Sequence, residues 1–404
     1  MKKLIKKFTF FLTLSVFTLF GTLTYYSYHL PDSYYCDNDS GMNITFGKIL
    51  KITARPENLS GTAPVDKISS GTTQAQLMLM NVIPIKSVEV QNIDVPMLSP
   101  CGKPFGIKLI MDGVMVIKTG DVACNGKNIS PAKDAGIKKG DIIKSVNGTE
   151  ITSNNELEKA VSDLSSRQIQ IVLIRDGKEI CTEISPVYSD SDGKYKLGIW
   201  VRDSSAGIGT VTYLDTLTNT FGGLGHPVCD SDTGQIIPLS SGEVMEVNIC
   251  GVKKGICGTP GELQGSFSGP ESCGMLMINN KYGVFGTISP DFSASEPIPM
   301  ALKQDIKTGK AHIYSTLSGD EPEVYEIEIE EIDYNTDNTS KNMVIKITDK
   351  ELLKKSGGIV QGMSGSPIIQ NGKLVGAVTH VFVDDPSRGY GIFCENMYKI
   401  SQGL

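Results

Sequence analysis

The chain has 404 residues, of which 40% are hydrophobic and 21% charged, so it is long enough for two or three domains with ordinary cores. Its formal net charge is −7, which provides no concentrated basic surface and excludes nucleic acid as the expected partner. The 43 glycines favour a turn-rich, mainly β protein.

The first thirty residues have the composition of a membrane anchor. Four lysines within the first seven residues precede an uncharged run over residues 8–28. That run is long enough to cross a bilayer as a helix, and the positive charge before it places the N-terminus in the cytoplasm. We therefore expect a cytoplasmic tip and transmembrane anchor over residues 1–30, with the bulk of the chain outside the cytoplasm. A cleaved signal peptide is the alternative, but no Ala-x-Ala site follows the run.

The next two segments differ in pattern. Residues 31–100 are polar and mixed, and we expect a juxtamembrane region with a small β subdomain. Residues 101–187 resemble a PDZ domain, an α+β module, most specifically in the run Ala-Gly-Ile-Lys-Lys-Gly-Asp-Ile-Ile that starts at Ala135 and leads to the turn Asn147-Gly148. In such domains a glycine-containing apolar loop binds a peptide carboxylate, and Phe105, Gly106 and Ile107 match that loop. The groove is expected to bind either a partner peptide or another part of the same chain.

Residues 195–404 have β patterns throughout. The run Val324 to Ile329 alternates apolar residues with glutamates, which indicates a strand with one solvated face. The segment is long enough for a double β-barrel. The expected fold class is therefore mainly β, with an N-terminal transmembrane helix, a PDZ domain and a C-terminal β-barrel-type domain.

The most informative motif of this last segment is Gly-Met-Ser-Gly-Ser-Pro over residues 362–367, followed by two apolar runs that flank Asn371-Gly372. A serine on a glycine turn that enters a β-hairpin resembles the nucleophile segment of chymotrypsin-like peptidases. We therefore expect residues 195–404 to be a β-barrel-type serine peptidase domain. We assign Ser364 as the nucleophile, because Ser366 precedes a proline and is committed to the following strand. The backbone N–H groups of Gly362 and Ser364 are expected to form the oxyanion hole.

A serine nucleophile needs a base, and histidine is the usual one near neutral pH. His29 lies beside the anchor, His312 has no glycine framing, and His380 is expected to border the substrate cleft. His226 lies in a glycine-rich turn, Gly-Gly-Leu-Gly-His-Pro, and is the favoured base. For the orienting acid the pattern leaves Asp349, Asp215, Asp230 and Asp232 open.

Neither a metal nor another cofactor is expected. Four of the nine cysteines gather loosely, but none of them forms a Cys-x-x-Cys pair of the kind that binds zinc; they are Cys229, Cys250, Cys257 and Cys273. Irregular spacing and an odd number leave both disulfides and free thiols open.

The combination of anchor, PDZ domain, Gly-Leu-Gly-His-Pro and the nucleophile segment resembles the SpoIVB (stage IV sporulation protein B) peptidase family over residues 1–404. The resemblance assigns the catalytic roles to Ser364, His226 and Asp349. It implies a signalling protease that crosses the forespore membrane, with its bulk between the forespore and mother-cell membranes, and that cleaves itself, which could release it. It also implies that the protease cuts a membrane-bound regulator of an intramembrane metalloprotease and so activates a late mother-cell sigma factor.

Two other functions are compatible with parts of the sequence. A membrane-tethered PDZ scaffold with a weak protease domain would predict loss of Ser364 or His226, and both are present. A general envelope quality-control protease also joins trypsin-like and PDZ modules, but there the protease comes first, whereas here the order is reversed.

Overall fold

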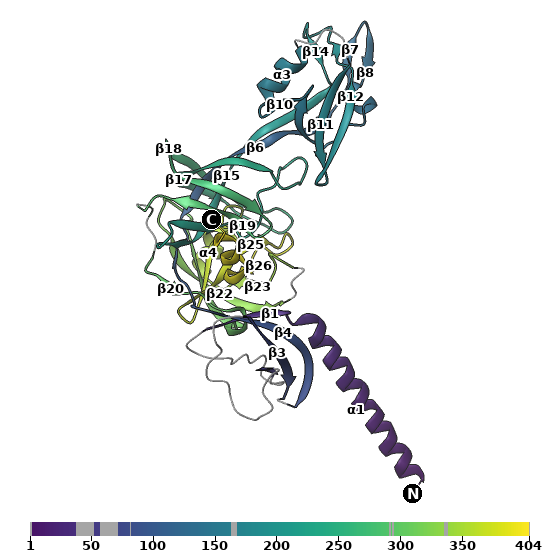
Figure 1. Cartoon of the computed structure of the whole chain (residues 1–404). Coiled ribbons are helices and arrows are strands. Elements are labelled where there is room, and N and C mark those ends of the chain that lie inside the picture. The colour runs from purple at the N-terminus through teal and green to yellow at the C-terminus, as the bar shows by residue number, and fades with distance from the viewer. Residues whose placement is uncertain are drawn as a thin grey trace.

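The structure is a computed structural model that describes residues 2–37, 52–56, 72–80, 82–162, 168–290, 292, 295–334 and 338–403. It confirms the mainly β fold class. Helix α1 (Lys2–His29) extends away from the rest of the chain (Figure 1). Its segment Ile5–His29 is long and apolar enough to cross a membrane. A small sheet follows it, with strand order β1 (Ser33–Asp37), β4 (Ile83–Ile93), β3 (Thr72–Leu79) and β2 (Ile52–Pro56).

The first of two barrels is a closed ring of strands. Its order is β6 (Pro104–Thr119), β17 (Leu239–Lys253), β18 (Glu262–Asn280), β19 (Gly283–Ile288), β16 (Thr220–Gly223) and β15 (Ile199–Asp215), and β15 pairs with β6 to close it. Strand β5 (Met97–Pro100) adds to β15, and β20 (Ile298–Pro299) adds to β5. The interior is apolar, with the rings of Phe105 and Phe221 in an edge contact at 5.7 Å.

A PDZ-like unit is inserted into this barrel. Strands β6 and β15 leave the barrel side by side and continue into the unit, which lies apart from both barrels (Figure 1). The unit packs around its own apolar core. Its elements are β7 (Val122–Cys124), β8 (Lys127–Ile129), α2 (Pro131–Asp134), β9 (Ile142–Val146), β10 (Thr149–Glu150), α3 (Asn154–Ser162), β11 (Ile169–Arg175), β12 (Lys178–Ile184), β13 (Val187–Tyr188) and β14 (Tyr195–Lys196).

This insertion corrects the expected peptide-binding loop. Phe105, Gly106 and Ile107 lie in the barrel half of β6, paired with β17 on one side and β15 on the other. Phe105 is fully buried in the barrel core, so it is not free to bind a peptide. The sequence prediction failed because a single 16-residue strand serves both domains, and no local pattern marks where one domain ends.

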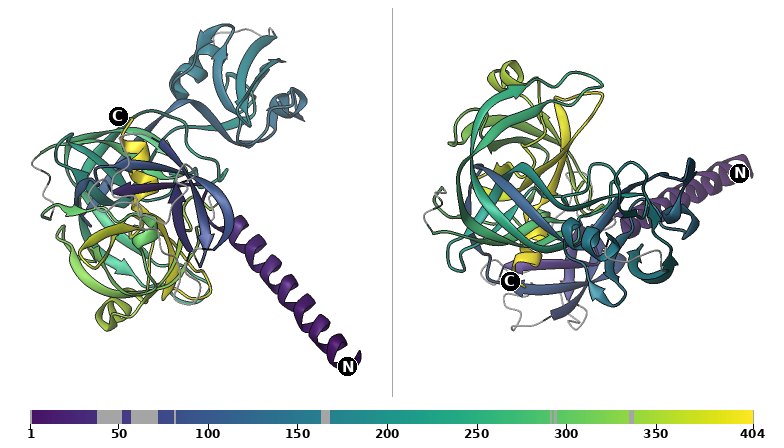
Figure 2. Two further views of the ribbon diagram at one scale, coloured as in Figure 1. Left: turned by 60° about the horizontal axis from the view of Figure 1, so that its bottom comes forward. Right: turned by 90° about the horizontal axis from the view of Figure 1, so that it is seen from above.

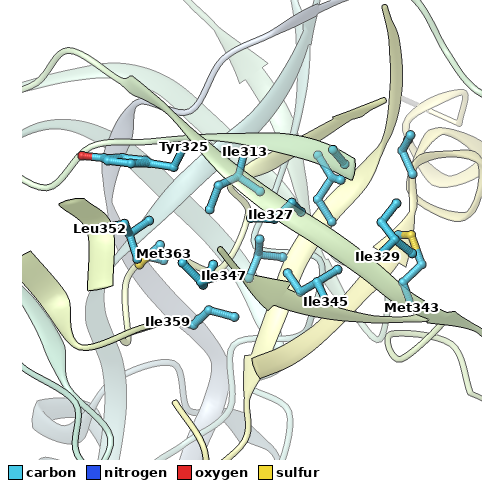
Figure 3. Close-up of a cluster of buried hydrophobic side chains, with 14 of the residues drawn as sticks. Ile313, Tyr325, Ile327, Ile329, Met343, Ile345, Ile347, Leu352, Ile359 and Met363 are labelled. Atoms are coloured by element: carbon cyan, nitrogen blue, oxygen red, sulfur yellow. The ribbon is translucent and has the colours of Figure 1, made fainter. Parts of the chain in front are cut away.

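The second barrel is closed in the order β21 (Gly309–Ser315), β22 (Glu323–Ile332), β23 (Met343–Ile347), β26 (Arg388–Phe393), β25 (Lys373–Val381) and β24 (Pro367–Gln370). Tyr325, Ile327 and Ile329 point inward from β22 (Figure 3), while Glu326 and Glu328 face solvent, as the alternation predicted. Helix α4 (Lys350–Ser356) links β23 to the nucleophile segment. Helix α5 (Cys394–Ser401) follows β26, and the 3₁₀ turn η1 (Lys303–Asp305) precedes β21. Figure 2 shows the barrels from two further sides.

Candidate active site

A cavity of about 390 Å³ lies between the two barrels. The first barrel contributes residues of β6 and β15 and the turn after β16, and the second contributes the segment before β24 and the end of β25. Ser364 and His226 both line it, together with Ile107, Leu109, Gly207, Ile208, Leu224, Pro227, Val228, Cys229, Ile359, Val360, Gln361, Gly362, Thr379, His380 and Val381. The structure therefore brings the predicted nucleophile and the predicted base to one cavity.

The turn that presents Ser364 depends on two glycines. Gly362 and Gly365 have φ of +97° and +99°, a region that residues with a side chain rarely adopt. A Cβ atom on Gly365 would overlap the backbone carbonyl of Thr210, so the turn packs directly on β15. The hydroxyl of Ser364 donates to the carbonyl oxygen of Thr379 at 2.6 Å. Ser366, by contrast, is fully buried, which leaves Ser364 as the serine that faces the cavity.

Strand β15 orients the peptide groups of the nucleophile turn. The N–H of Thr210 donates to the carbonyl of Ser364 at 3.0 Å, and its hydroxyl donates to the carbonyl of Gly362 at 2.7 Å. The hydroxyl of Thr212 holds the carbonyl of Gly365 at 2.8 Å. In the part of the chain that the structure describes, the N–H groups of Gly362 and Ser364 donate no hydrogen bond. An oxyanion hole requires two such donors, which is the role expected of these two residues.

His226 is held by its own turn. Leu224 and Gly225 have φ of +63° and +69°, which reverses the chain after β16. The Nδ1 atom of His226 lies 2.8 Å from the carbonyl oxygen of Pro227. A carbonyl oxygen can only accept, so Nδ1 carries the proton and Nε2 keeps the lone pair that a base uses. Burial lowers the pKa of His226 below its ordinary value of 6.5, while the bond to Pro227 opposes part of that shift.

His380 lies at the rim of the same cavity. Its ring centroid is 4.8 Å from that of His226, with the planes tilted by 38°. Partial burial, the approach of His226 and the charge of Lys341 lower the pKa of His380 to about 4, although the residue as a whole is exposed. His380 is therefore neutral near pH 7 and does not place a charge beside His226.

The structure does not bring the predicted acid, Asp349, to His226. Asp349 is the N-cap of α4, and its carboxylate accepts the N–H groups of Glu351 and Leu352 at 2.9 Å each. It is not among the residues that line the cavity. The structure therefore corrects the expectation that Asp349 orients His226. The carbonyl oxygen of Pro227 lies at the hydrogen-bonding position on Nδ1 where the carboxylate of an orienting acid would lie.

The other acids left open by the sequence also have different partners. The carboxylates of Asp230 and Asp232 form ion pairs with Arg202. Asp215 accepts the N–H of Leu217 at 3.0 Å within a turn. Among the described contacts, none joins a carboxylate to the imidazole of His226.

A second cavity, of about 710 Å³, lies in the PDZ-like unit. Helix α3 forms one wall, and β14 with the beginning of β15 forms the other. The turn between β14 and β15 consists of Leu197 and Gly198 and leads into Ile199, the first residue of β15. Gly198 has a φ of +69°. This is the apolar, glycine-containing loop expected of a carboxylate-binding groove. Sequence reasoning missed it, although the Leu-Gly-Ile pattern before a long strand was the available signal.

No group of three or more metal-ligating side chains gathers in the described part of the chain. The nine cysteines, all described, form no disulfide in this structure.

Comparison with known families agrees with this geometry. The SpoIVB peptidase S55 family matches residues 193–398, and the PDZ domain family matches residues 93–185. The chain belongs to the SpoIVB peptidase family. It is accordingly a serine peptidase with a PDZ domain, as the resemblance in the sequence predicted.

Individual proteins match only parts of the chain. The "Putative zinc metalloprotease LL2128" of Lactococcus lactis is 33% identical over 70 residues, which span 17% of this chain and 16% of that protein. The PDZ domain of an SdrC-like protein from Listeria monocytogenes is 24% identical and covers 23% of this chain and 90% of its own, with a TM-score of 0.19. The Rv3671c protease, in an inactive form, is 13% identical and covers 48% and 81%, with a TM-score of 0.28.

Proposed function

We propose that this chain is a membrane-anchored serine endopeptidase in which Ser364 is the nucleophile and His226 is the general base. The observation that carries the proposal is that both side chains line one cavity, beside two backbone N–H groups with no described acceptor. Family membership supports peptide-bond hydrolysis as the reaction.

The geometry supports the following steps. The hydroxyl of Ser364 turns from the carbonyl of Thr379 toward Nε2 of His226, which takes its proton as Oγ attacks the substrate carbonyl carbon. The N–H groups of Gly362 and Ser364 stabilise the resulting oxyanion. The imidazolium then protonates the leaving amine, and the carbonyl of Pro227 keeps Nδ1–H in place throughout. Water, activated by the same base, releases the acyl group.

The lining of the cavity defines a class of substrate. Ile208 and Val381, one from each barrel, are half-buried and face the cavity, and none of the described residues that line it is Asp, Glu, Lys or Arg. A charged side chain bound there would be desolvated without a partner, which is costly. We therefore infer that an uncharged, apolar residue of the substrate occupies this cavity.

Family membership supports a role in sporulation signalling. In this role the protein lies in the forespore membrane with its bulk between the two membranes, cleaves itself, and cuts a membrane-bound regulator of an intramembrane metalloprotease to activate a late sigma factor. The span Ile5–His29 supports the anchor, and the groove beside α3 supports binding of a protein end before cleavage.

Hydrolysis by the full chain in detergent tests the proposal. We expect the wild-type chain to shorten itself and to cleave unfolded casein after apolar residues, and Ser364→Ala to do neither. Ser366→Ala is the matched control and keeps substantial activity if it folds. Equal activity of the Ser364→Ala and wild-type chains would refute the assignment.

A further inference from the structure

Arg202 lies in β15 at the junction between the PDZ-like unit and the first barrel. Up to and including Arg202, β15 pairs with residues 115–119 of β6, and from Ser204 onward β15 pairs with the barrel half of β6. The register shifts between Arg202 and Ser204, so a β-bulge stands at the junction. A bulge changes the direction in which side chains leave a strand. Here the two charged side chains at the bulge, Asp203 and Arg202, contact different parts of the molecule.

The first of these side chains, Asp203, contacts the groove of the PDZ-like unit. Its carboxylate accepts the N–H of Asn154, the first residue of α3, at 2.8 Å. Helix α3 and the beginning of β15 are the two walls of the groove. The junction is therefore connected directly to the element that would move if the groove widened around a peptide.

The second side chain, Arg202, contacts the loop that follows His226. Its guanidinium pairs with Asp230 and, at 2.7 Å, with Asp232. The side chain of Asp230 is 0% exposed and that of Arg202 29% exposed. Burial alone would raise the pKa of Asp230, but the N–H of Thr233 and the charge of Arg202 outweigh it and hold that pKa below its ordinary value. Asp230 is thus a buried carboxylate whose main cationic partner comes from the junction.

Asp230 in turn shapes the loop. Its carboxylate accepts the N–H groups of Asp232 at 3.0 Å and Thr233 at 2.8 Å, and its own N–H donates to the carbonyl of Gln235. This turn starts four residues after His226. On the barrel side, Asn279 binds both the N–H and the carbonyl of Val228. The loop that carries His226 is therefore held both by the barrel and at the PDZ junction.

We propose that Arg202 is a positioning residue that couples the PDZ groove to the placement of His226, through its ion pairs with Asp230 and Asp232. The inference rests on the proposed role of His226 as the base. A peptide that shifts α3 moves the junction through Asp203, and the rigid, buried pair transmits that shift to the loop of the base. The ligand is a peptide that enters the groove beside Leu197–Ile199. Its binding changes the orientation of the His226 imidazole relative to Ser364.

The test is the rate at which a peptidyl diphenyl phosphonate, an irreversible serine reagent, labels Ser364 in the full chain in detergent. We expect Arg202→Gln to slow labelling at least tenfold and to move the acid limb of its pH profile upward, because a displaced loop leaves His226 less buried. Arg202→Lys should restore part of the rate, since a lysine can still pair with Asp230. Because the two side chains act as a unit, the double variant Arg202→Gln with Asp230→Asn should be no slower than the slower single variant.

Arg175→Gln is the matched control. Arg175 pairs with Asp141 at 2.6 Å, and their side chains are 24% and 1% exposed, close to the values at Arg202 and Asp230. That pair lies wholly within the PDZ-like unit, so its loss should lower the melting temperature while leaving the labelling rate within twofold of wild type.

Wild-type labelling by the Arg202→Gln chain, or equally slow labelling by Arg175→Gln, would overturn the coupling while leaving Ser364 and His226 in their roles. Absence of labelling in the wild-type chain would overturn the proposed function and, with it, this inference.

Discussion

At the scale of single residues, the nucleophile turn depends on how closely its backbone approaches β15. Gly365 combines a φ of +99° with contact to the carbonyl of Thr210, whereas Gly372, in the hairpin turn after it, has a φ of +74° and no neighbouring atom within 4 Å. We expect Gly365→Ala to lose more than about 2 kcal/mol of the free energy of unfolding and nearly all activity, because strain and overlap with backbone add. Gly372→Ala should cost about 1 kcal/mol and keep its activity. Urea unfolding and peptide hydrolysis on both variants measure the difference, and equal effects would mean that the contact with β15 is unimportant.

The protonation of His226 sets a second residue-scale expectation. A base must be neutral to act, and burial lowers the pKa of His226 below 6.5, so the imidazole stays neutral to a lower pH than a free histidine does. Activity should therefore persist below pH 6.5 and fall only as the pH drops through the lowered pKa. The pH profile of kcat/KM for a short peptide measures this limb. A midpoint at or above pH 6.5 would contradict the burial of the base.

At the scale of elements, Asp349 belongs to α4 rather than to the catalytic cavity. Asparagine caps a helix about as well as aspartate, whereas alanine costs about 1 kcal/mol. We expect Asp349→Asn to keep the melting temperature and most of the turnover, and Asp349→Ala to lose stability but to keep turnover below its melting temperature. Calorimetry and kcat on both variants provide the check. A severe fall in kcat for a fully folded Asp349→Asn chain would return the acid role to Asp349.

At the scale of the whole molecule, the PDZ-like unit interrupts a barrel instead of preceding it. In β15, Ser204 pairs with Ile110 of β6, so a short turn can close the barrel where the unit leaves it. Replacing residues 112–203 by a four-residue turn should leave a folded barrel pair, although the coupling through Arg202 is lost. Deleting residues 101–187 removes β6 from the ring and should prevent folding. Limited proteolysis separates the two outcomes, and a stable 101–187 deletion would show that the ring does not depend on β6.

Turns are encoded locally in this chain, whereas pairing between distant strands is not. The turns at Gly362–Gly365, Asn371-Gly372 and Asn147-Gly148 follow from residues that tolerate positive φ, and the structure has them where the sequence places them. The hydrogen-bond partner of Nδ1 of His226 is a backbone carbonyl, which a pattern of side chains cannot predict. The groove at Leu197–Ile199 was not predicted, because the segments that line it are far apart in the sequence. The pairing of β6 with β15 across the inserted unit leaves no periodic pattern of residues that would reveal it.

The proposed mechanism depends on Ser364 as the nucleophile, activated by His226. Mass spectrometry of tryptic peptides, after the full chain reacts with a peptidyl diphenyl phosphonate that carries an apolar residue, tests both roles together. We expect a single adduct, on Ser364, in the wild-type chain and in folded Ser366→Ala. The adduct should be absent from Ser364→Ala and should form at least a hundredfold more slowly in His226→Ala. An adduct on Ser366, or labelling of the His226→Ala chain at the wild-type rate, would contradict this mechanism.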